Sequence, residues 1–402
     1  MAAASRLARD AFGRLPDGRA VERVTLRGMH GFEACIITYG ATLQALIVPD
    51  AAGRCEDVVL GHADFAGYLG LRKFFGATVG RYANRIANAR FMLDGVEVRL
   101  AANNGPHALH GGLEGFDRKL WQIVEIEDGA EPFVTLAYSS ADGEESYPGR
   151  LDVRLTYRLT GPAELSLAFT AKADRSTICN LTNHTFFNLH GAESGESILD
   201  HRLTVEADHF LAIDPQAIPL QEPPRKVAGT PFDFRNPTTI GARIRHDDMQ
   251  LRHGRGYDHT FCLDGARTLR LAARLEAPRS GRILELLTDQ PGLQVYSGNY
   301  LDGTIAGKGG RLYRQSDAIC LEPQIWPDAP NRPDFPSAHL TPDTVYRHNT
   351  VYRFLTEVAA HGRPEPDVKL ANPYEVTGHT KSSAATRTRS AIQGSEACSS
   401  SS

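Results

Sequence analysis

The stretch LDVRLTYRLT, residues 151–160, decides the fold class because apolar and polar side chains alternate along it without a break. This alternation predicts a β-strand with one buried face. The apolar positions are Leu151, Val153, Leu155, Tyr157 and Leu159. After Gly161-Pro162, the run ELSLAFTAKA at residues 164–173 repeats the period of two, so we expect an antiparallel hairpin.

Further strand-like runs lie on both sides of this hairpin, separated by clusters of Gly, Pro, Asn and Asp. They occupy residues 21–27, 58–60, 133–138, 269–275, 283–288, 294–297, 318–325 and 351–358. Helical periodicity is nearly absent. Many short strands with one apolar face each need a second sheet to cover that face, so the sequence predicts an all-β fold, a large antiparallel β-sandwich.

No linker-like composition interrupts residues 20–362. Residues 381–402 include eight Ser and almost no large apolar side chain. Such a segment cannot bury enough surface to offset the entropy lost on ordering. We therefore expect one domain at residues 12–362, followed by a disordered Ser-rich tail at residues 363–402.

The charge balance narrows the class of partner. The 402 residues carry 44 Lys and Arg against 48 Asp and Glu, a formal net charge of −4 without long blocks of one sign. Nucleic acid and acidic membranes therefore have no electrostatic support, and a neutral small molecule fits better. Neither an apolar run long enough to cross a membrane nor a secretory signal in the first twenty residues is visible, so we expect a cytoplasmic location. The six scattered cysteines predict reduced, mostly buried thiols.

The densest polar cluster on an apolar background is NLTNHTFFNLH at residues 180–190. An extended chain would send Asn180, Thr182, His184, Phe186 and Asn188 to one face. A lone buried histidine is more often a hydrogen-bonded core residue than a functional one. The amide and hydroxyl neighbours of His184 favour a functional role here.

A second cluster, AICLEPQIWPD at residues 318–328, places Cys320, Glu322, Gln324 and Trp326 on one face of a strand. Burial of Glu322 would raise its pKa toward the range of an acid or base near neutrality. An ordinary buried ion pair is an equally good interpretation of this residue taken alone.

Three further patches are unusually polar. They contain Arg81, Asn84, Arg85 and Arg90; His107 and His110; and Asp258 with His259. Each alone is typical of a solvated loop. The spacing of His107 and His110 allows a metal site in principle, but the surrounding Gly and Pro oppose the helix that this spacing suits.

Taken together and in this order, the clusters resemble the aldose 1-epimerase (galactose mutarotase) family. The motifs are GRYANRIANARF, LHGG, FDRKLWQ, YPGRLDVRLTY, NLTNHTFFNL, GTPFDFR, GYDHTFCL, LQVYSGNYLDGT and LEPQIWPDAPNRPDFPS, within residues 12 to about 360. The resemblance implies a galactose mutarotase-like β-supersandwich. It also implies an isomerase that interconverts the α- and β-anomers of free hexoses such as glucose and galactose, without cofactor or metal and as a monomer or weak homodimer.

The resemblance also assigns roles, residue by residue. Glu322 matches the general base and His184 the general acid. Arg85, His110 and Asp258 match sugar-binding positions, and Asn84, Gln294 and Gln324 match further contacts. Two departures stand out, because Ser146 replaces the usual Gly and His107 adds an imidazole.

The chemistry accounts for these residue types independently of the family. A hemiacetal opens when a base removes the C1 hydroxyl proton while an acid protonates the ring oxygen, so both groups must flank that bond. Three alternatives remain: a hexose-6-phosphate 1-epimerase that uses Arg81, Arg85 and Arg90, a non-catalytic sugar-binding protein, and a glycosidase with Asp258 and Glu322 as paired carboxylates.

Overall fold

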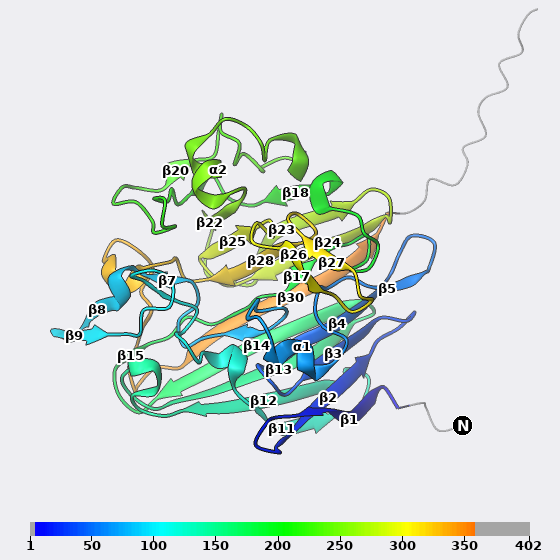
Figure 1. Ribbon diagram of the computed structural model, residues 1–402, viewed down its shortest axis with the longest axis horizontal. Helices are drawn as coiled ribbons and strands as arrows, with labels where there is room; N and C mark the ends of the chain where they lie inside the picture. Colours follow the sequence, from blue (N-terminus) through cyan, green and yellow to red (C-terminus); the bar gives the residue numbers. More distant parts are fainter. Residues whose placement is uncertain (1–4, 358–402) are drawn as a thin grey trace, which may run out of the picture. The chain divides into compact units, whose positions relative to one another are not determined.

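The computed structural model describes residues 5–357, and the predicted tail at residues 363–402 lies outside that range. The regular secondary structure of the described chain is almost entirely β-strand (Figure 1). Its two α-helices, α1 (Phe65–Leu69) and α2 (Met249–Gly254), are one or two turns long. None of the helices in the described part is long and apolar enough to cross a bilayer.

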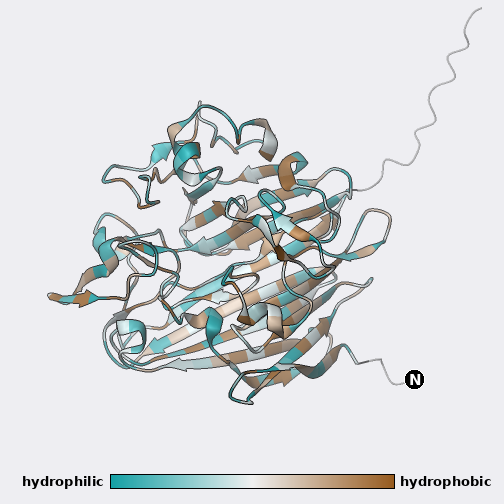
Figure 2. Ribbon diagram, in the orientation of Figure 1, coloured by the Kyte–Doolittle hydropathy of each residue, from teal (hydrophilic) through white to brown (hydrophobic). Residues whose placement is uncertain are grey.

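A nine-stranded antiparallel sheet is built around the predicted hairpin. The hairpin strands are β13 (Leu151–Gly161) and β14 (Glu164–Ala173), the third and fourth strands of the sheet. In sheet order the nine are β11 (Gln122–Glu127), β12 (Phe133–Ser140), β13, β14, β30 (Tyr346–Thr356), β24 (Arg282–Thr288), β23 (Arg270–Ala277), β18 (Arg202–Val205) and β21 (Thr238–Thr239). The five odd-numbered apolar residues of β13 are all buried, as the alternation predicts. Figure 2 shows this alternation as brown and teal bands along the long strands.

A six-stranded sheet lies above the long strands as drawn in Figure 1. Its order is β17 (Phe186–Phe187), β28 (Ile319–Gln324), β25 (Gly292–Tyr296), β22 (Asp258–Cys262), β19 (His209–Phe210) and β20 (Arg225–Lys226). A five-stranded sheet follows the chain order: β1 (Leu7–Arg14), β2 (Ala20–Arg27), β3 (Glu33–Ile37), β4 (Thr42–Pro49) and β5 (Cys55–Asp57).

One apolar core joins the three sheets. The same cluster of buried side chains includes Leu155 of β13, Ile36 of β3, and Leu293 and Leu321 of the six-stranded sheet. Each sheet covers the apolar face of another, which confirms the predicted sandwich and all-β class.

Five two-stranded ribbons complete the fold. They pair β6 (Thr78–Val79) with β16 (Thr182–Asn183), β7 (Arg85–Ile86) with β10 (Ala108–Leu109), β8 (Arg90–Leu93) with β9 (Val96–Arg99), β15 (Thr177–Ile178) with β29 (His339–Leu340), and β26 (Asp302–Ala306) with β27 (Leu312–Arg314).

Two details differ from the sequence interpretation. Residues 180–190 do not form one strand, because Thr182 and Asn183 pair with β6 whereas Phe186 and Phe187 pair with β28. The chain changes partner at His184, so the polar side chains of this segment do not share one face. Residues 58–60 form only an isolated bridge, from Val59 to Phe187.

Candidate active site

The register of three neighbouring strands places polar side chains on one face of the six-stranded sheet. Gln294 of β25 lies opposite Glu322 of β28, and Asp258 of β22 lies opposite Tyr296 of β25. The residues between them, including Leu293, point into the apolar core. The alternation of each strand therefore separates a core face from a face that lines a cavity of about 470 Å³.

The facing wall of the cavity comes from the loops around β7 and β10. Asn84 and His110 hold these loops together, since the amide of Asn84 donates to Nδ1 of His110 (3.2 Å) and the amide of His110 donates to the Asn84 carbonyl (3.1 Å). An acceptor Nδ1 leaves the proton of neutral His110 on Nε2. Burial, with His184 and Arg85 nearby, holds the pKa of His110 well below its usual range. His110 is thus a neutral hydrogen-bond donor.

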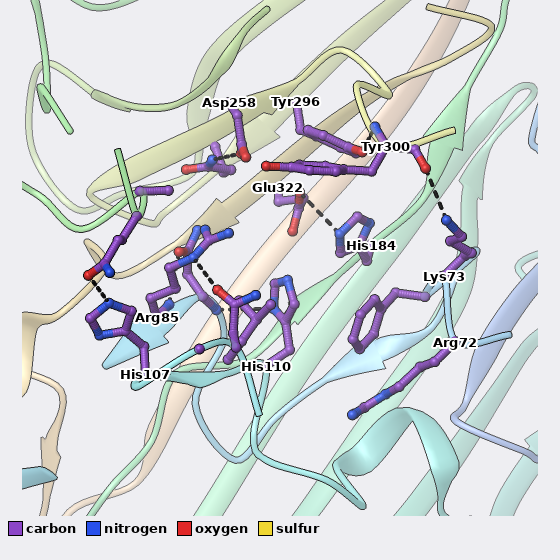
Figure 3. Close-up of a pocket in the computed structure, with 18 of the residues that line it drawn as sticks. Arg72, Lys73, Arg85, His107, His110, His184, Asp258, Tyr296, Tyr300 and Glu322 are labelled. Carbon is purple, nitrogen blue, oxygen red and sulfur yellow. Dashed lines mark hydrogen bonds and ion pairs between the residues drawn. The ribbon is translucent and has the colours of Figure 1, made fainter. Parts of the chain in front are cut away.

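His184 and Glu322 face each other across the floor of the cavity (Figure 3). Nε2 of His184 is 3.6 Å from Oε1 of Glu322, and the side chains are 7% and 2% exposed. Nδ1 of His184 and Oε2 of Glu322 are buried without a hydrogen-bond partner among residues 5–357.

Aromatic rings enclose the imidazole of His184. Phe74 stacks on one side, with ring centroids 5.7 Å apart, and Phe186 stacks at 5.0 Å. Burial lowers the pKa of His184 to about 4. Burial, followed by the nearby charge of Asp258, raises the pKa of Glu322 well above its usual value, against the opposing effect of Arg85. Both shifts favour the uncharged form of each group, a neutral imidazole and a protonated carboxyl.

A hydrogen-bond relay fixes Asp258. Oγ1 of Thr260 donates to Oε1 of Gln294 (2.5 Å), and Nε2 of Gln294 donates to Oδ1 of Asp258 (2.6 Å). On the other side, Nε of Arg85 donates to Oδ1 of Asn104 (3.1 Å). Burial raises the pKa of Asp258, although Arg85 and the bond from Gln294 oppose that effect. The cavity thus offers hydroxyl groups both fixed acceptors and fixed donors.

The structure brings seven of the eight sequence-predicted site residues to this cavity. They are Asn84, Arg85, His110, His184, Asp258, Gln294 and Glu322. Gln324 is the exception, since its side chain is fully buried and is not part of the cavity lining. β28 continues past the end of the cavity there, with Gly292 opposite Gln324. The prediction of a sugar contact for Gln324 is therefore not supported by its position.

Sequence reasoning missed several lining residues: Arg72, Lys73, Phe74, Gln216, His253, Tyr296 and Tyr300. Tyr296 could have been found, because it lies two positions after Gln294 on the same strand face. Phe74 could not have been predicted as a lining residue, because its position depends on the conformation of a loop and not on a sequence motif.

The three arginines that the sequence suggested for a phosphate do not gather at the cavity. Arg81 is 1% exposed and its guanidinium donates to the Gly149 carbonyl and the Ser140 hydroxyl, away from the cavity. Arg90 points outward to Glu97. Of the three arginines, only Arg85 lines the cavity.

Two groups of three potential metal ligands occur among residues 5–357. One is His184, Cys320 and Glu322, and the other is His190, Asp200 and His201. His107 and His110, whose spacing allows a metal site in principle, belong to neither group. Nδ1 of His107 accepts from the amide of Asn88, and its Nε2 bonds to Gln216 at 2.8 Å.

Comparison with known proteins points to one family. The sequence profile of the aldose 1-epimerase family matches residues 22–353. Galactose mutarotase from Bos taurus is 46% identical over 347 residues, covering 86% of this chain and 98% of that protein. Aldose 1-epimerase from Escherichia coli is 38% identical over 348 residues, covering 85% and 97%. Among solved structures, galactose 1-epimerase from Lactobacillus acidophilus superposes with a TM-score of 0.77 at 28% identity, over 88% of this chain and 99% of that one.

Proposed function

The chain belongs to the aldose 1-epimerase family, and from that premise we propose that it interconverts the α- and β-anomers of free hexoses such as glucose and galactose, with Glu322 as general base and His184 as general acid. One observation carries the proposal: the Glu322 and His184 side chains meet 3.6 Å apart on the floor of a cavity lined with hydrogen-bonding groups.

The number of protons on Glu322 and His184 fits this chemistry. The reactive form needs a Glu322 carboxylate and a His184 imidazolium, and it contains the same single proton as the two uncharged forms that burial favours. Moving that proton from Glu322 to His184 produces the reactive form without exchange with solvent. A sugar C1 hydroxyl donating to Glu322 favours the carboxylate, because a hydrogen bond to the charged form lowers a pKa.

The reaction then proceeds in balanced steps. Glu322 removes the C1 hydroxyl proton, the electron pair forms the aldehyde carbonyl, the bond from C1 to the ring oxygen breaks, and His184 protonates that oxygen. Rotation about the C1–C2 bond presents the other carbonyl face. Reclosure returns each proton by the reverse route, with the two groups in exchanged roles.

Arg85, His110, Asp258, Asn84 and Gln294 are proposed to hold the remaining hydroxyls while the carbonyl turns. The neutral Nε2–H of His110 and the guanidinium of Arg85 donate, whereas the carboxylate of Asp258 accepts. Because both kinds of group are fixed by their own hydrogen bonds, the open-chain aldehyde stays oriented over the catalytic pair.

Polarimetry of freshly dissolved α-glucose and α-galactose tests the proposal. We expect the protein to accelerate the approach to the equilibrium rotation, and to do so equally after chelator treatment. Loss of activity on chelation would revive a metal-dependent route. Faster reaction with glucose 6-phosphate than with glucose would favour the hexose-6-phosphate alternative, and binding without acceleration would favour a sugar-binding protein.

The remaining expectations belong to the same proposal. We propose a cytoplasmic monomer or weak homodimer whose only required partner is the aldose, and a catalytic unit within residues 12–362. The balanced formal charge of −4 and the completion of the cavity by residues before 357 support these statements. A chain ending at Gly362 should keep full activity, and sedimentation measures its oligomeric state.

A further inference from the structure

A cysteine that the proposed reaction does not use lies beside the catalytic pair. Cys320 precedes Glu322 by two positions on β28, so both side chains leave the same face of the strand. One ligand atom each of His184, Cys320 and Glu322 lies within 4.8 Å of the others, and all three residues are buried. Thiolate, imidazole and carboxylate are the three ligand types that zinc takes from proteins.

The second group of potential ligands, His190, Asp200 and His201, is less suited to binding a metal. Nε2 of His201 accepts the amide of Leu189 at 3.1 Å, which fixes the proton on Nδ1. His190 bonds to Oδ1 of Asp200 at 2.7 Å, and Arg279 occupies Oδ2 at 3.1 Å. Each of these three residues is therefore already engaged in a hydrogen bond or an ion pair within the protein.

The catalytic cluster has its lone pairs free. Nε2 of His184 makes no hydrogen bond among the described residues, where its nearest acidic oxygen is 3.6 Å away on Glu322. Oε2 of Glu322 has no partner in the same part of the chain. The separation of 3.6 Å is close to the roughly 3.4 Å edge expected between ligands about 2.1 Å from a tetrahedral zinc.

Charge also favours a divalent cation at this point. A thiolate and a carboxylate together balance Zn²⁺, and His184 coordinates as a neutral imidazole, so the complex has no net charge. A neutral complex suits the surroundings, because Phe186 and Tyr296 pack around Cys320 and Phe74 stacks on His184.

We propose that His184, Cys320 and Glu322 form an inhibitory site for a zinc-type divalent cation, which shuts the active site by occupying both proposed catalytic groups. Binding releases the thiol proton of Cys320 and, where Glu322 is protonated, its carboxyl proton, and each goes to water. Of the three ligands, His184 and Glu322 line the cavity that would hold the sugar. The metal and the sugar then compete for the side chains of His184 and Glu322.

The activity readout rests on the proposed function, so a second readout independent of activity is needed. Co²⁺ bound to a thiolate gives a sulfur-to-metal charge-transfer absorption that oxygen and nitrogen ligands do not give. We expect this absorption when the full chain is titrated with Co²⁺, and its loss in Cys320→Ser. Cys55→Ser is the matched control, because Cys55 is an exposed free thiol away from the cavity.

In the activity assay, Zn²⁺ should inhibit galactose mutarotation competitively, and a chelator should restore the rate. Cys320→Ser should raise the inhibiting Zn²⁺ concentration at least about tenfold, the lower end of what loss of even an outer partner of a metal ligand costs. Cys55→Ser should leave it unchanged.

Two outcomes overturn the proposal. One is a wild-type chain saturated with Co²⁺ that lacks the thiolate absorption, a result that holds even if Cys320→Ser does not fold. The other is equal Zn²⁺ sensitivity of Cys320→Ser and the wild type. A chain without mutarotase activity that still shows the cysteine-dependent absorption would refute the proposed function and leave the metal site standing.

Discussion

The ring of Phe74 stacks on the imidazole of His184, with centroids 5.7 Å apart and planes 16° apart. Phe74 is itself held from behind, since the guanidinium of Arg72 lies 4.6 Å from its ring centre and pairs with both carboxylate oxygens of Asp117. The backbone of Phe74 is in the left-handed region, with φ of 61°. A bulky residue adopts this conformation only when its surroundings require it, so Phe74 is a positioning residue for His184.

Replacing Phe74 should therefore change the titration of His184. In Phe74→Leu part of the imidazole becomes hydrated, so we expect its pKa to rise from about 4 toward the ordinary 6.5. The pH at which kcat/KM declines on the acid side should rise accordingly, and NMR titration of the His184 ring measures the pKa directly. Phe74→Tyr keeps the stack and should behave like the wild type. A variant that only lowered the melting temperature would show a purely structural role.

Substitution of the proposed acid and base should affect turnover far more than sugar binding. Glu322→Gln and His184→Asn each remove a group that moves a proton in the transition state, which typically contributes about 10² to 10⁴ in rate. Steady-state polarimetry gives kcat, and sugar-induced changes in tyrosine fluorescence give binding. Near wild-type turnover in Glu322→Gln would take this carboxylate out of the mechanism and leave the family membership as evidence of fold.

The pH dependence of the rate follows from the two pKa directions. The residue types alone suggest that the rate falls at low pH through protonation of Glu322 and at high pH through loss of the His184 proton. The directions in which burial shifts the two pKa values favour the opposite assignments. Below about pH 4 the imidazole takes a second proton into the pair, whereas the raised pKa of Glu322 governs loss of the only proton at high pH.

We therefore expect a bell-shaped profile of kcat/KM with its acid midpoint near 4 rather than near 6.5. Rates measured across the pH range in which the protein stays folded test this expectation. An acid midpoint close to that of free imidazole would mean that His184 is hydrated in the working enzyme.

The groups on the cavity wall should affect affinity more than turnover. Arg85→Ala, His110→Ala and Asp258→Asn remove contacts that are present in the bound sugar as well as in the transition state, so KM should increase by the larger factor. Gln324→Met is the matched control, because Gln324 is fully buried outside the cavity and neither of its amide atoms has a partner among the described residues. An equal loss of sugar affinity in Gln324→Met would restore Gln324 to the binding site.

The sequence predicted correctly those features that follow from the alternation of apolar and polar residues along a strand. The period of two in β13 and β14 placed their side chains correctly, and the same rule put Glu322 on a polar strand face. It failed at His184, where the chain leaves one sheet partner for another, because a change of partner within two residues leaves no periodic trace. It also placed Gln324 in the site, since alternation gives the face of a residue but not where a cavity ends.

Contacts between loops could not be predicted from the sequence, for a different reason. The amide of Asn84 bonds to the ring of His110, and Arg72 supports Phe74, only because several strands bring these loops together. Motif resemblance identified Asn84 and His110 nevertheless, whereas Arg72 and Phe74 belong to no motif that was recognised.

Arg81 and Arg90 come from the same motif and should differ sharply in their effect on stability. The buried guanidinium of Arg81 donates to the Gly149 carbonyl at 2.7 Å and to the Ser140 hydroxyl at 2.6 Å, and so joins β12 to the loop before β13. Arg81→Met removes the donor of the buried Gly149 carbonyl and one of the two partners of the Ser140 hydroxyl, which still donates to Glu144, so we expect the free energy of unfolding to fall by at least about 2 kcal/mol.

Arg90→Met should cost no more than about 1 kcal/mol, because Arg90 is half exposed and lies 3.6 Å from Glu97 in a surface ion pair. Urea unfolding of both variants measures the difference, and neither should change KM for hexoses or for a hexose 6-phosphate. A selective increase in KM for the phosphorylated sugar in Arg81→Met would show that this guanidinium reaches the substrate after all. Because its donors are directed at Gly149 and Ser140, we expect its whole effect to appear in stability.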